Sequence, residues 1–159
     1  NHAIFNIDPQ KIIASGGSAG GHIAAATGTI HSVNESTDDL NIDPTPAAMV
    51  LFNPVFDNGP NGYHGSNAKA LIEDDFLCHC KSYPISNGKW ASLFKERYKE
   101  ISPFHNISDQ TSPSLVMFGN QDHMVPVATA ESFQEQMKQL NNVCQLIIYK
   151  GAKHGFFKG

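Results

Sequence analysis

The sequence is short of positive charge and of long hydrophobic runs, and each shortage excludes a class of partner. Eleven Lys and Arg are scattered among 15 Asp and Glu, which gives a formal net charge of −4 at pH 7. A surface that binds nucleic acid needs clustered positive charge, so no nucleic-acid partner is expected. No apolar run approaches the ~20 residues that a membrane-spanning helix requires, so no membrane span is expected.

Cysteine is also scarce, with three residues in 159. Cys78, Cys80 and Cys144 lack the even count and regular spacing of a disulfide framework. The stretch Cys78-His79-Cys80 offers groups that bind zinc, but adjacent ligands strain a tetrahedral site and no second Cys/His pair lies at zinc-finger spacing, so no metal site is predicted. The odd count and the lack of a visible signal peptide slightly favour a cytoplasmic location, although the chain begins at Asn1 rather than Met and its localisation stays unknown.

What the sequence does contain is a set of four short apolar runs separated by turns and helical patterns. The runs are rich in β-branched or aromatic residues and nearly continuous, which is typical of strands buried on both faces of a parallel sheet. Turn residues follow each run at once, beginning with Ser15, Gly16 and Gly17 after the first run. The four predicted strands cover residues 11–14, 48–52, 114–118 and 145–149.

Helices are predicted between these strands, over the alanine-rich residues 20–30 and over residues 127–140. The second helix carries an amphipathic stripe with apolar residues at spacings of 3, 4 and 3, formed by Ala130, Phe133, Met137 and Leu140. Strands that alternate with helices predict an α/β fold with a parallel sheet and flanking helices.

Residues 57–112 interrupt the alternation and are too long for a plain crossover between strands. With helix-like stretches near 67–78 and 89–100, they predict a helical insertion between the second and third strands. In an open α/β sheet ligands bind at the carboxyl edge, so we expect the insertion to lie over that edge as a flap or cap. The whole chain, residues 1–159, is then a single domain with this insertion inside it.

The segment Gly16-Gly17-Ser18-Ala19-Gly20 matches the G-x-S-x-G pattern of a nucleophile elbow, after a predicted strand and before a predicted helix. Glycines two residues before and two after the serine leave room for the backbones to approach, and the Ala19 N–H can point at a developing oxyanion. Two alternatives stay open at this point: a phosphate cradle, whose usual glycine spacings are absent, and a serine that only caps the helix.

A serine nucleophile needs a base and a group that orients the base, and both follow in chain order. Asp122 lies just past the third predicted strand and His154 just past the fourth, 32 residues later. Ser18, Asp122 and His154 therefore all project from strand ends at one edge of the predicted sheet. Asp57, after the second strand, is a rival for the acid.

With these residues the chain resembles members of the α/β-hydrolase superfamily. The resemblance is greatest to the bacterial carboxylesterases and lipases of the hormone-sensitive-lipase and acetyl-xylan-esterase-like group. The resemblance runs over nearly the whole chain and implies an ester hydrolase that acts on a small-molecule ester through an acyl-enzyme, with no cofactor. It implies Ser18 as nucleophile, His154 as base and acid, and Asp122 as the carboxylate that orients the imidazole. The motifs that carry it are residues 16–22, 53–54, 102–104, 119–126 and 151–156.

The family also has earlier strands and a glycine-rich oxyanion loop, and nothing similar precedes Lys11. The chain is therefore expected to be an N-terminally truncated hydrolase that by itself is weakly active or inactive, because a lost oxyanion donor lowers the rate by about 10²–10³. Its first strand would present an uncovered sheet edge, which favours self-association. A prolyl-oligopeptidase-type serine peptidase and a non-catalytic binding module with the same fold remain alternatives.

Overall fold

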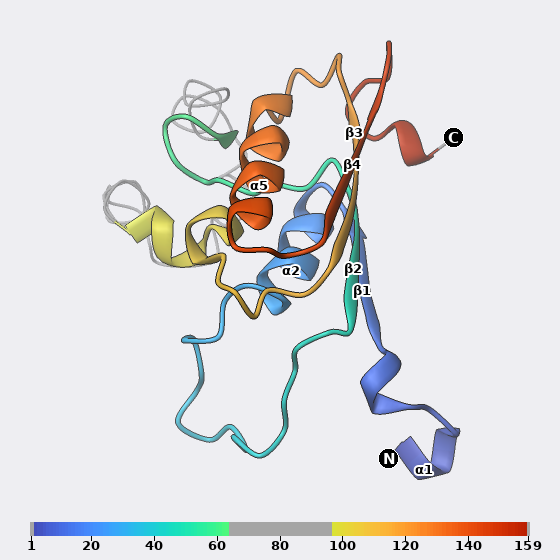
Figure 1. Ribbon diagram of the computed structural model, residues 1–159, viewed down its shortest axis with the longest axis vertical. Coiled ribbons are helices and arrows are strands. Elements are labelled where there is room, and N and C mark those ends of the chain that lie inside the picture. Colours follow the sequence, from blue (N-terminus) through green and yellow to red (C-terminus); the bar gives the residue numbers. More distant parts are fainter. Residues whose placement is uncertain (1, 64–96, 159) are drawn as a thin grey trace, which may run out of the picture.

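The computed structural model describes residues 2–63 and 97–158 (Figure 1). Within these residues one parallel sheet has the strand order β1-β2-β3-β4, so that each strand pairs with its neighbours in the sequence. The strands are β1 Ile13–Gly17, β2 Ala48–Phe52, β3 Ser114–Gly119 and β4 Cys144–Tyr149. The α/β fold with a parallel sheet is therefore confirmed.

Strand β1 begins and ends later than predicted. Pro9–Lys11 form a 3-10 helix, η1, after a short first helix, α1, at His2–Phe5. Asp8 caps η1 by accepting a hydrogen bond from the Gln10 N–H at 3.0 Å. At the other end Gly16 pairs with Leu51 and Gly17 with Phe52, so the predicted turn at Ser15–Gly17 is wrong. Pairing with β2 keeps these residues extended, and the chain turns only at Ser18.

Two longer helices cross between the strands, and both end earlier than predicted. Helix α2 spans Ala19–Thr27 and ends at Gly28, whose N–H bonds to the carbonyls of the preceding turn. Helix α5 spans Val127–Gln139, and the next residue, Leu140, is its C-cap. Three residues of the predicted stripe, Ala130, Phe133 and Met137, are fully buried, whereas Leu140 is 36% exposed because it lies beyond the helix.

Both helices cover the same face of the sheet, with α2 against β1 and α5 against β4 (Figure 1). Met49, Leu51, Val116 and Phe118 point into this core and are completely buried. The alternate residues of β2 and β3 are only partly buried. The prediction that the strands are buried on both faces is wrong for the described residues, because α2 and α5 both lie on one side of the sheet.

The chain from β2 to β3 contains the predicted insertion, of which the structure describes residues 57–63 and 97–112. Two 3-10 helices occur there, η3 at Tyr98–Ile101 and η4 at Pro103–Asn106. The predicted helix at 67–78, most of the one at 89–100, and the Cys78-His79-Cys80 stretch lie outside the described residues. None of the helices in the described ranges has the length and apolar character needed to cross a bilayer.

Candidate active site

Ser18 occupies the sharp turn between β1 and α2. Its φ of 57° and ψ of −122° lie far from the allowed regions of an ordinary L-residue, and such strain is concentrated at functional sites. The turn is held by a hydrogen bond from the Ser18 N–H to the Phe52 carbonyl at 2.9 Å. The Ser18 hydroxyl makes no capping bond to α2, so the alternative of a serine that only caps the helix is not supported.

The glycines of the elbow differ in how much space a side chain at each position would have. A Cβ on Gly16 would lie 2.3 Å from the carbonyl oxygen of Gly20, so only glycine lets β1 and α2 approach this closely. A Cβ on Gly20 would meet no described atom within 4 Å, which corrects the expectation that Gly20 is required for space. The next residue, Gly21, has less space around it than Gly20, because a Cβ on Gly21 would lie 3.0 Å from Pro54.

His154 reaches Ser18 from the loop that follows β4. Its Nε2 lies 2.8 Å from the Ser18 Oγ, and its Nδ1 lies 2.7 Å from the Asp122 Oδ2. The His154 side chain is 17% exposed, so the imidazole is largely sheltered from solvent. An imidazole that donates through Nδ1 to a carboxylate presents an unprotonated Nε2 to the serine, which is the tautomer of a general base.

Asp122 follows β3 and its side chain is completely buried. Its Oδ1 accepts hydrogen bonds from the backbone N–H groups of Met124 at 2.8 Å and Val125 at 2.9 Å, so it also holds its own turn. The loops that carry Asp122 and His154 are tied together by a bond from the Gly151 N–H to the Asn120 side chain at 2.7 Å. This bond helps to fix the distance between carboxylate and imidazole.

Ala19 is the first residue of α2, where a backbone N–H has no acceptor within its own helix. The positive end of the helix dipole adds to this donor beside the Ser18 hydroxyl. The position suits an N–H that stabilises negative charge on an oxygen attached to the attacked carbon.

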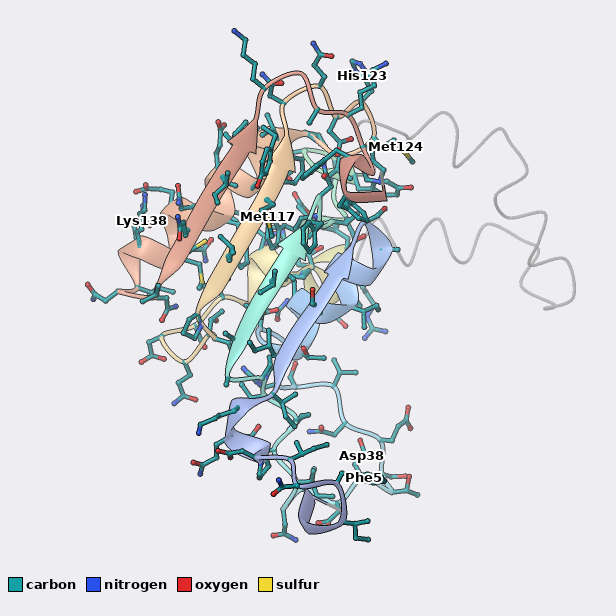
Figure 2. All side chains as sticks on the ribbon, turned by 90° about the vertical axis from the view of Figure 1, so that its right-hand side faces the viewer. Phe5, Asp38, Met117, His123, Met124 and Lys138 are labelled. Atoms are coloured by element: carbon teal, nitrogen blue, oxygen red, sulfur yellow. The ribbon has the colours of Figure 1, made fainter. Side chains whose placement is uncertain are left out.

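The rival acid Asp57 and the histidine on α2 have hydrogen-bond partners outside this chain of hydrogen bonds. Asp57 bonds to the Gly59 N–H at 2.7 Å and lies 3.4 Å from the Nε2 of His105, so it pairs with another histidine. His22 on α2 bonds through Nδ1 to the Val55 carbonyl at 2.9 Å. In Figure 2, His123 lies at the end of the sheet toward which the strand arrows point.

Two residues outside the predicted triad also approach the site. The ring of Phe157 packs over Gly17, where a Cβ would lie 2.2 Å from it. Asn53, directly after β2, is completely buried and donates through its side-chain amide to the Asp122 Oδ2. The Asn53-Pro54 pair after a buried strand was the available signal, but it does not indicate a partner 69 residues away. Within 2–63 and 97–158 no cluster of His, Cys, Asp or Glu could hold a metal ion.

Comparison with known proteins gives relatives that are named as esterases. The acetylxylan esterase of Xylanibacter ruminicola is 26% identical over 164 residues, which cover 96% of this chain and 27% of that protein. The probable carboxylic ester hydrolase LipM of Mycobacterium tuberculosis is 27% identical over 143 residues, which cover 89% of this chain and 31% of that protein. The chain thus spans about a third of the length of these curated relatives.

Solved structures agree with this result. A thermophilic esterase of the planctomycete Thermogutta terrifontis with bound propionate superposes with a TM-score of 0.73 and 35% identity, covering 98% of this chain and 51% of that one. The esterase 2 of the same species, phosphoramylated by tabun, superposes with a TM-score of 0.70 and 32% identity, covering 96% and 48%.

The family model described as alpha/beta hydrolase fold matches residues 1–158. Together with the parallel sheet and the esterase relatives, this match confirms the resemblance to esterases of the hormone-sensitive-lipase and acetyl-xylan-esterase-like group that the sequence motifs indicated. The chain belongs to the α/β-hydrolase fold family.

Proposed function

We propose that the protein is a serine hydrolase that cleaves carboxylic esters of small molecules through an acyl-enzyme. The observation that carries this proposal is the unbroken chain of hydrogen bonds from Ser18 through His154 to Asp122, with contacts of 2.8 and 2.7 Å. It begins at a serine in a strained backbone conformation and ends at a fully buried carboxylate. A nucleophile, a base and an orienting group are thereby within reach of one another.

In the proposed first step the Ser18 Oγ attacks the ester carbonyl carbon while the His154 Nε2 accepts the hydroxyl proton. The carbonyl oxygen becomes an oxyanion, and the Ala19 N–H at the start of α2 donates to it. Asp122 holds the imidazole in the required tautomer and stabilises the imidazolium. The intermediate collapses when His154 protonates the departing alcohol oxygen, which leaves the acyl group on Ser18.

In the second step a water molecule is the nucleophile and the Ser18 oxygen is the leaving group. His154 takes a proton from a water molecule, which attacks the acyl carbon, and then returns that proton to the Ser18 oxygen. The carboxylic acid leaves and the free serine is restored. No step requires a metal or an organic cofactor.

A panel of small esters and amino-acid arylamides, measured with the wild type and with Ser18→Ala, tests the proposal. Ester cleavage that is lost in Ser18→Ala is the expected result. Cleavage of the arylamides alone would instead identify a peptidase.

We also propose that residues 57–112 form one insertion that leaves and re-enters the sheet domain at a single place. The Asn58 N–H donates to the Ser102 Oγ at 2.9 Å, and the Asp57–His105 pair joins the same two segments. Proteolytic cleavage between residues 64 and 96 should therefore leave both fragments associated on a native gel, and their separation would contradict the proposal.

Self-association through the β1 edge is a further part of the proposal. Strand β1 is at the edge of the described sheet, and Ile12 and Ile13 are 51% and 57% exposed. An apolar strand edge favours pairing with another chain. Sedimentation analysis should show a dimer that Ile13→Lys disrupts and that Ile148→Lys, on the opposite edge strand, does not. A monomeric wild type would contradict this part.

A further inference from the structure

Each of the four strands contributes a residue at the carboxyl edge, and the contribution of β2 is Asn53. The backbone of Asn53 joins the strands on either side. Its N–H donates to the Met117 carbonyl of β3 at 2.9 Å, while the carbonyl of the preceding Phe52 accepts the Ser18 N–H at 2.9 Å. Asn53 therefore lies between the elbow that carries Ser18 and the strand that leads to Asp122.

The Asn53 side chain continues this connection. Its Nδ2 donates to the Asp122 Oδ2 at 2.5 Å, and the same oxygen bonds to the His154 Nδ1 at 2.7 Å. An ionised carboxylate only accepts hydrogen bonds, so the amide must turn its NH₂ group toward Asp122. One carboxylate oxygen is thus held between an amide donor and the imidazole.

Asn53 has two energetically unfavourable features, which its hydrogen bond to Asp122 helps to offset. The Asn53 Oδ1 is buried and has no hydrogen-bond partner within the ranges that the structure describes. The backbone φ of Asn53 is +42°, in the left-handed region that asparagine tolerates better than most residues. A buried unpaired oxygen is destabilising, whereas a hydrogen bond to a charged group is among the stronger ones in a protein.

We propose that Asn53 is a positioning residue for the hydrolase reaction: its amide holds the Asp122 carboxylate in the orientation in which Oδ2 receives the His154 Nδ1–H. This inference rests on the proposed function of Ser18, His154 and Asp122. Within the described residues the Asn53 side chain bonds to Asp122 and not to Ser18, so its proposed action is through Asp122.

Two substitutions remove the amide in different ways. Asn53→Gly keeps the freedom for a positive φ and leaves a space, whereas Asn53→Leu keeps the size and accepts the backbone strain. The same substitutions at Asn141 are matched controls. Asn141 also has a positive φ, 61°, but it is exposed and lies before β4, at the opposite end of that strand from His154.

Two measurements on the full chain separate positioning from folding. The first is the rate at which a fluorophosphonate labels Ser18. The second is the downfield NMR resonance of the His154 Nδ1–H, assigned with His154→Gln, which reports the bond to Asp122. Both Asn53 variants should label about tenfold or more slowly, which corresponds to about 1.4 kcal/mol or more, and should shift or lose the resonance. Both Asn141 variants should match the wild type in both measurements.

The inference is overturned if either Asn53 variant folds, keeps the resonance unchanged and labels within twofold of the wild type. Slower labelling with an unchanged resonance also overturns it, because the amide would then act elsewhere. If the Asn53 variants do not fold, the side-chain amide protons of Asn53 are observed in the wild type and in Asp122→Asn. Their resonances should move between the two proteins, and unchanged resonances overturn the inference.

Because the His154 Nδ1–H resonance does not depend on labelling of Ser18, the role of Asn53 can be tested separately from the proposed function. A Ser18 that is not labelled even when the family's earlier strands and oxyanion loop are present contradicts the hydrolase proposal, whereas the His154 and Asn53 resonances still report whether the amide positions Asp122.

Discussion

Gly16 and Gly20 flank Ser18 in the same motif, yet their replacement by alanine is expected to have opposite effects on stability. A Cβ at Gly16 would lie 2.3 Å from the Gly20 carbonyl oxygen and 2.4 Å from its carbonyl carbon, well inside the 3.4 Å at which ordinary contact begins. These are backbone atoms of the first turn of α2, so no side-chain rotation can relieve the clash. The backbone of Gly16 is not left-handed, so the clash is the main effect.

Overpacking of this kind destabilises a protein by about 1–3 kcal/mol. For a chain of this size the melting temperature changes by about 2–4 °C per kcal/mol, so Gly16→Ala should melt about 2 to 12 °C below the wild type. A Cβ at Gly20 would meet nothing within 4 Å among the described residues, and alanine is the better helix former by about 0.5–1 kcal/mol. Gly20→Ala should therefore melt at the wild-type temperature or up to about 4 °C above it.

Thermal unfolding followed by circular dichroism, with urea midpoints as a second measure, compares the two variants with the wild type. The labelling rate of Ser18 should fall in Gly16→Ala as well, because relief of the clash moves the elbow. A Gly16→Ala protein as stable as the wild type, or a Gly20→Ala protein that is clearly less stable, would refute the described approach of β1 to α2.

Three further predictions concern the core, the thiol and the carboxylate. Phe133 stacks on Phe56 with ring centroids 3.8 Å apart, so Phe133→Ala should lose about 3–5 kcal/mol and lower the melting temperature by about 6 to 20 °C; a loss below 1 kcal/mol would contradict this packing. Burial raises the pKa of the Cys144 thiol, so peptide mapping should show it unmodified by iodoacetamide at neutral pH until the chain unfolds, and rapid modification of the folded chain would be the contrary result. Asp122→Asn should slow ester cleavage by about 10⁴, as the equivalent change does in another serine hydrolase, because the amide orients His154 in the wrong tautomer; activity near that of the wild type would exclude the role of Asp122.

Much of the fold was predictable from local patterns. Strand β2 coincides with its predicted range, and β3 and β4 are each one residue longer than predicted, because continuous apolar runs bounded by turns identify parallel strands well. The approach of Asp122 to His154 also followed from the sequence. Their separation suits one helix and one strand, which places the two residues at the ends of neighbouring strands.

Other features depend on contacts between distant segments and were missed for that reason. The extended conformation of Gly16 and Gly17 comes from their pairing with Leu51 and Phe52, and glycine itself gives no strand signal. The apolar pattern of a strand does not reveal which face of the sheet each crossover helix will cover. The contact of Asn53 with Asp122 requires the register of β2 against β3, which no local pattern contains.

The central claim, that Ser18 is a nucleophile activated by His154, is tested most directly by identifying the residue that a fluorophosphonate modifies. The account predicts that mass spectrometry finds one adduct per chain on the peptide containing Ser18, and that Ser18→Ala and His154→Gln are not labelled under the same conditions. A protein that also carries the family's earlier strands and oxyanion loop yet remains unlabelled, or an adduct on another residue that persists in Ser18→Ala, would contradict it.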